Sequence, residues 1–112
     1  MPTRAALTEF LGAERITEMN EASAIELLEA NHKFPGPYLF KVIGRQEKGF
    51  VARVVAAVRE EMAEPVDPPF RVRETAGGRH VSVSIEPVMQ TAEQVLAVYR
   101  RIQGIAGLVI LW

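Results

Sequence analysis

The sequence contains no cysteine, only two histidines and no long apolar run. Without cysteine, the chain forms no disulfide, no thiolate nucleophile and no zinc site built on cysteine. The histidines, His32 and His80, lie far apart and fit no metal-ligand spacing, so we expect no metal and no cofactor. No apolar stretch approaches the ~18 residues of a membrane span, and Glu9 interrupts the first apolar residues. We therefore expect a soluble cytoplasmic protein.

The chain also lacks a strong net charge. Its 13 Lys and Arg residues and 14 Asp and Glu residues give a formal charge of -1. Such a balance provides no global field that attracts nucleic acid or an anionic membrane, so we expect neither as a partner. The length of 112 residues, with 48% hydrophobic residues, suits a single hydrophobic core.

Charge and chain breakers divide the sequence in two. The first 36 residues hold three basic and six acidic side chains, and Phe34-Pro35-Gly36-Pro37 then forms a break that no helix crosses. We predict an acidic helical arm over residues 1–33 and a folded domain over residues 34–112. In the arm, Ser23 and Glu26 have the capping-box spacing and predict a helix that begins there and ends near Asn31.

Hydrophobic periodicity predicts six elements in the domain. Strands are expected over 38–43, 70–75, 79–86 and 107–112, and helices over 49–63 and 92–103. Gly77-Gly78 suits a hairpin turn, Thr91 suits a helix cap, and the apolar run 107–112 suits a strand covered on both faces. The order βαββαβ predicts an α+β fold, a ferredoxin-like two-layer sandwich. Its antiparallel sheet would have the order 4-1-3-2 when the four strands are numbered along the chain.

Several short motifs resemble a known family. They are Phe34-Pro-Gly-Pro-Tyr-Leu-Phe-Lys-Val-Ile-Gly44, Ser82-Val-Ser-Ile85, and Glu93-Gln94 with Tyr99. In this order, over residues 34–112, the chain is similar to the YbeD-like family of small bacterial proteins of uncharacterised function. The resemblance implies a ferredoxin-like fold similar to ACT regulatory domains and a regulatory role, with no established ligand. It supplies no catalytic residues.

Strand alternation places a polar set on the outer face of the predicted sheet. If Phe40, Val42, Phe70 and Val72 face the core, the side chains that point outward form the candidate ligand-binding set Lys41, Arg71, Arg73, His80, Ser82 and Ser84. Such a set suits an anionic group. It does not suit a Ser-His-carboxylate relay, because residues two apart on a strand are separated by about 6.5 Å, beyond hydrogen-bond reach.

The same alternation leaves apolar residues on the other half of the outer face. We assign an interface to Leu39, Ile43, Val109 and Leu111, with Leu108, Ile110 and Trp112 as the alternative outward set of the last strand. Ile25 and Leu28 of the arm, together with Leu7, Phe10 and Leu11, would cover this patch by folding back, unless a second copy covers it in a homodimer.

These observations favour a nonenzymatic regulatory or adaptor domain that senses a small anionic metabolite or binds a protein partner through its sheet. The alternative is a pure protein-interaction or homo-oligomerisation module without a small ligand. An enzyme with a pocket between sheet and arm is the third reading, and the absence of paired carboxylates or a phosphate-binding loop argues against it.

Overall fold

The computed structural model describes residues 16–62, 66–75 and 77–112 as an α+β protein with antiparallel sheets. Within these ranges the helices are α2 (Glu21–Asn31), α3 (Phe50–Glu61) and α4 (Ala92–Gln103). The longer strands are β2 (Phe40–Arg45), β3 (Phe70–Glu74), β4 (His80–Ile85) and β6 (Leu108–Leu111). Each predicted strand and helix therefore has a counterpart, with ends shifted by a few residues. None of these helices is both long and apolar enough to cross a bilayer.

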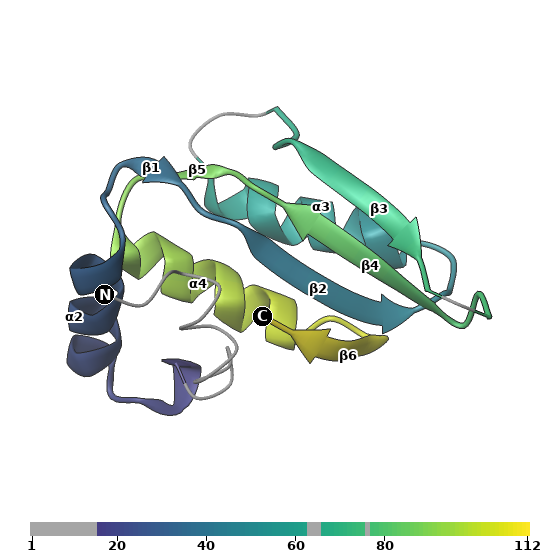
Figure 1. The fold of residues 1–112 in the computed structure, drawn as a ribbon, viewed down its shortest axis with the longest axis horizontal. Helices are drawn as coiled ribbons and strands as arrows, with labels where there is room; N and C mark the ends of the chain where they lie inside the picture. The colour runs from purple at the N-terminus through teal and green to yellow at the C-terminus, as the bar shows by residue number, and fades with distance from the viewer. Residues whose placement is uncertain (1–15, 63–65, 76) are drawn as a thin grey trace.

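The four longer strands form one sheet with the order β3-β4-β2-β6, and α3 and α4 pack against one of its faces (Figure 1). A second sheet pairs β1 (Gly36–Pro37) with β5 (Val88–Met89). The sequence predicts one sheet of four strands, whereas the described residues form six strands in two sheets. Two-residue strands are too short to show an alternating pattern, so the second sheet has no sequence signature.

The helix α2 begins earlier than predicted. Its cap is Asn20, whose side-chain oxygen accepts a hydrogen bond from the backbone N–H of Ser23 at 2.8 Å. Ser23 is therefore the third residue of the helix and not its cap. Asn and Ser are comparably good caps, and the sequence offered both within four positions. The expected end at Asn31 is correct.

The strand β2 continues through Gly44, beyond the predicted end at residue 43. The ring of Phe50, the first residue of α3, occupies the space where a Cβ at position 44 would stand. Gly44 thus lets the start of α3 pack closely on the sheet, and its role is contact with a ring and not termination of a strand.

The helix α4 and the β3–β4 hairpin agree closely with the sequence. Thr91 caps α4 by accepting a hydrogen bond from the N–H of Gln94 at 3.1 Å, and Gly104 follows its last turn. Gly77 and Gly78 both have positive φ, as the predicted hairpin requires. In β4, Val81, Val83 and Ile85 are buried and the residues between them are half-buried, so the predicted alternation is confirmed.

The helix α2 lies beside α4, on the helical side of the molecule (Figure 1). Ala24 and Leu28 belong to the main core, and Arg100 of α4 lies 3.8 Å from the carboxylate of Glu21. The prediction that Ile25 and Leu28 cover the outer face of the sheet is therefore wrong. Ala24 and Leu28 are the buried residues of α2, which packs beside α4, and periodicity within one helix does not reveal such a pairing. Leu7, Phe10 and Leu11 lie outside the described residues.

The two edge strands are more exposed than predicted. Phe70 and Val72 of β3 were expected in the core but are 42% and 46% exposed, because the helices pack on β2, β4 and β6. In β6, Val109 and Ile110 are also exposed, so this strand is not covered on both faces. For β3, alternation identified the side of the sheet correctly, whereas burial depends on whether a helix lies opposite.

Candidate functional site

The register of the sheet brings the predicted cations and hydroxyls into adjacent rows. Lys41 of β2 and Arg71 of β3 pair with Ser84 of β4 from opposite sides. Ile43 and Arg73 flank Ser82 in the same way. Paired residues of neighbouring strands share one face of a sheet, so each serine lies between a residue of β2 and an arginine of β3.

These rows form the floor of a hollow of about 720 Å³ on the outer face. Five of the six predicted ligand-binding residues line it, namely Lys41, Arg71, Arg73, Ser82 and Ser84. We call these five residues the basic face. The sixth, His80, pairs with Arg45 nearer the hairpin and is not part of this lining. The structure thus brings together a set that the sequence identified by strand parity alone.

The three cations of the basic face make no ion pair with any described carboxylate. The ammonium nitrogen of Lys41 lies 5.9 Å from the ring centroid of Trp112, a distance typical of a cation–π contact. Among the described lining residues the carboxylate is that of Glu74, which accepts a hydrogen bond from Gln46 at 3.0 Å. Among the side chains of the described lining residues, three are therefore cationic and one is anionic.

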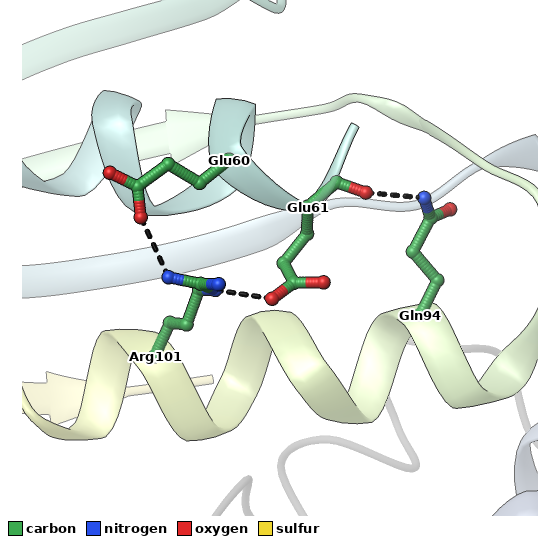
Figure 2. A network of polar contacts seen from close by, with 4 residues as sticks. All are labelled: Glu60, Glu61, Gln94 and Arg101. Atoms are coloured by element: carbon green, nitrogen blue, oxygen red, sulfur yellow. Dashed lines mark hydrogen bonds and ion pairs between the residues drawn. The ribbon is translucent and has the colours of Figure 1, made fainter. Parts of the chain in front are cut away.

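Arginines on the helical side are held differently. Arg101 of α4 donates to Glu61 through Nε and to Glu60 through Nη1 at 2.6 Å, and Gln94 donates to the Glu61 carbonyl at 2.6 Å (Figure 2). The hydrogen bond to Glu61, and then its negative charge, raise the pKa of Arg101 above its ordinary value. Arg59 is paired in the same manner with Asp67 at 2.6 Å. Arg59 and Arg101 therefore form ion pairs within the chain, whereas the three cations of the basic face form none with a described residue.

The apolar part of the outer face needs correction at its last strand. Leu111, assigned to the interface, pairs with Val42 and is only 8% exposed, so it belongs to the core. A register shift between Ile43 and Gly44 of β2 leaves both Val109 and Ile110 exposed. Such a bulge inserts one residue and breaks strict alternation, which is why neither of the two sets considered from the sequence is right as a whole.

Of the other predicted interface residues, Ile43 is half-buried in the lining of the hollow and Leu39 is half-buried before β2 begins. The lining also includes Trp112, Val72, Glu74 and Thr75, which the sequence analysis did not assign to a ligand site. Trp112 exchanges backbone hydrogen bonds with Lys41 at 2.8 and 3.3 Å. Because Trp112 pairs with Lys41, its side chain lies on this face. This pairing depends on which strands are neighbours.

The side chains of this face offer hydrogen-bond donors and positive charge. Ser82 and Ser84 can donate hydrogen bonds, and the three cations supply charge-assisted donors for a carboxylate or a phosphate. Within the described ranges, no group of three His, Asp or Glu side chains lies close enough to hold a metal ion. His80 and Ser82 follow the spacing of a strand, with about 6.5 Å between them, which exceeds the reach of a proton relay.

Comparison with known families assigns most of this fold to one group. Residues 29–111 match the model of a family described as protein of unknown function (DUF493). This range includes the whole basic face and all strands of the larger sheet. A search of curated proteins returned no significant match.

Proposed function

The chain belongs to this family of unknown function, and we propose that it is a nonenzymatic regulatory or adaptor domain that binds an anionic group on the basic face. The ligand would be a small anionic metabolite, or the acidic group of a protein partner. One observation carries the proposal. Lys41, Arg71 and Arg73 line one hollow, and no described carboxylate forms an ion pair with any of them.

The arrangement suits an anion in size and in electrostatics. Strands in a sheet are spaced about 4.8 Å apart, so Lys41 and Arg71 start roughly 10 Å apart on either side of Ser84. Long flexible side chains at that separation can converge on one carboxylate or phosphate, with the Ser84 hydroxyl as a donor beneath it. The volume of about 720 Å³ lies within the range typical of small-molecule sites.

We also infer that the fold is of the ferredoxin-like class, similar to ACT regulatory domains. Two observations support this assignment. Read from its other edge, the larger sheet has the order β6-β2-β4-β3, and α3 and α4 lie on one face of it. The motifs similar to the YbeD-like family agree with it. A fold shared by many functions does not supply a ligand, so the proposed binding of an anion depends on the residues of the basic face.

A thermal-shift screen tests the proposal. The protein is heated with amino acids, nucleotides and acyl metabolites, each supplied well above its expected dissociation constant. A ligand at about 100 times that constant adds about 2.7 kcal/mol and raises the melting temperature by several degrees. We expect an anionic compound to do so for the native chain, to lose its effect on Lys41→Ala/Arg71→Ala/Arg73→Ala, and to weaken as salt is added.

The matched control removes the same number of cations from the helical side, as Arg53→Ala/Arg59→Ala/Arg100→Ala. All three of these arginines form ion pairs at the surface. This variant should keep the ligand-induced shift, measured against its own melting temperature. A shift that survives in the Lys41/Arg71/Arg73 variant would contradict the proposal. A panel with no response would favour the alternative, a pure protein-interaction or homo-oligomerisation module.

A further inference from the structure

The open edge of β3 is the most exposed strand surface among the described residues, since all five of its residues are exposed. The direction of its backbone N–H and C=O groups follows from the hydrogen bonds at both ends of the strand. Thr75 donates to the carbonyl of His80, and Glu86 donates to the carbonyl of Pro69, each at 3.0 Å. Hydrogen-bonded pairs alternate along an antiparallel ladder. The backbone N–H and C=O groups of Phe70, Val72 and Glu74 therefore point to the open edge.

The side chains along this edge differ between the two faces of the sheet. Phe70 and Val72 lie on the helical side, where neither is covered by a helix. Arg71 and Arg73 lie on the outer side and form no ion pair with any described carboxylate. An added strand would thus meet Phe70, Val72 and, at the end of the edge, Glu74 on one face, and two guanidinium groups on the other.

These arginines disfavour a second copy of this chain as the occupant. If β3 paired with itself in an antiparallel register centred on Val72, Arg71 of each copy would lie opposite Arg73 of the other. Like charges directly opposite each other destabilise a strand pair. Charged residues often protect an edge from self-association in this way, and the protection is selective because a strand with carboxylates at those positions is attracted.

We propose that the β3 edge binds an extended acidic segment of a partner protein, which adds to the sheet as an antiparallel strand. The segment alternates acidic and apolar residues, so that carboxylates meet Arg71 and Arg73 and apolar side chains meet Phe70 and Val72. Main-chain hydrogen bonds with the edge supply affinity, and the alternation supplies register. The proposal goes beyond binding in the hollow, because it requires the backbone edge and no small ligand.

The probe is the peptide Val-Glu-Val-Glu-Val amide, labelled with fluorescein through a Gly-Gly linker at its N-terminus, and binding to the full chain is followed by fluorescence anisotropy. We expect binding that weakens with salt and that is at least about tenfold tighter than for the same peptide with Lys in place of Glu. N-methylation of the central Val should abolish most of the binding, because that N–H pairs with β3. N-methylation of the Glu residues should have little effect, because those N–H groups point away from it.

On the protein, Val72→Pro removes one edge-facing N–H and leaves the ladder between β3 and β4 in place. We expect it to weaken the peptide by about tenfold or more, since at least one hydrogen bond is lost and the ring disturbs its neighbours. The control is Val109→Pro on the opposite edge, a residue of similar exposure (48% against 46%) without a pairing partner in β2. The peptide methylated at its central Val separates this proposal from the proposed function of the hollow, because it keeps both carboxylates and lacks only the N–H that pairs with the edge.

Three results would overturn the inference. The first is that the native chain does not bind the Glu peptide. The second is that Val72→Pro, or the peptide methylated at its central Val, binds as well as its unmodified counterpart. The third is self-association of the native chain in sedimentation that Val72→Pro abolishes, since a second copy would then occupy the edge.

Discussion

The cationic side chains on the two sides of this molecule differ in whether they form ion pairs. On the helical side, Arg59 and Arg101 contact carboxylates of the same chain at 2.6 Å. On the outer face of the sheet, Lys41, Arg71 and Arg73 form no such pair with any described residue. Charges of the first kind are balanced inside the protein and connect neighbouring segments. Charges of the second kind are available to an anion from outside, which is why the basic face is the stronger functional candidate.

Side-chain burial also differs between the helical side and the outer face of the sheet. The core lies between the sheet and the helices, and it includes Leu28 of α2 and Phe50 of α3. The outer face has no described helix against it, and its hydroxyls at Ser82 and Ser84 are only half-buried. Substitutions on the helical side should therefore affect mainly stability, and those on the sheet face should affect mainly binding. The following predictions test this division, beginning with the largest expected effect.

Leu28→Ala should lower the free energy of unfolding by about 2 to 5 kcal/mol, because it removes a fully buried side chain of the core. Leu27→Ala is the control, since it removes the same atoms from the neighbouring, half-buried position. Urea titrations of both variants measure the difference, and anion binding at the basic face should be unchanged. Equal losses from the two substitutions would mean that α2 does not contribute to the core as described.

The second prediction compares the loss of one hydroxyl on the helical side with the loss of one hydroxyl on the outer face of the sheet. Thr91→Ala should lower the free energy of unfolding by about 1 kcal/mol, because the N–H of Gln94 loses its cap. Ser84→Ala should change it by less than about 0.5 kcal/mol, since this hydroxyl is only half-buried and lines the open hollow. Chemical denaturation of the two variants side by side provides the measurement. A cost for Ser84→Ala as large as that for Thr91→Ala would show that the sheet face has a structural role.

The smallest effect concerns the arginines themselves. Arg101→Gln should lower the melting temperature slightly at low salt, because its hydrogen bonds with Glu60 and Glu61 are lost. The loss should shrink as salt screens the pair. Arg71→Gln should leave the melting temperature unchanged or raise it, because it relieves repulsion within the basic face. Thermal unfolding at low and high salt distinguishes the two, and a destabilised Arg71→Gln would reveal a structural partner for this side chain.

The sequence by itself determined the longer elements and, for β2, β3 and β4, the side of the sheet on which each residue lies. The alternation of β4, the cap and end of α4 and the glycine turn after β3 all depend on neighbours within a few positions. Such local preferences can be read without knowing the rest of the molecule. Strand parity alone was also enough to choose Lys41, Arg71, Arg73, Ser82 and Ser84, all of which line one hollow.

Only the tertiary structure decided which of these faces are covered. Phe70 and Val72 have the pattern of core residues, yet they are exposed because β3 extends past the helices. Leu28 has the pattern of a docking residue, yet it packs with α4 and not on the sheet. The bulge in β6 and the pairing of Trp112 with Lys41 likewise depend on contacts between distant segments. Periodicity specifies a direction for each side chain, whereas burial, ion pairing and the shape of a hollow depend on what the rest of the chain places opposite it.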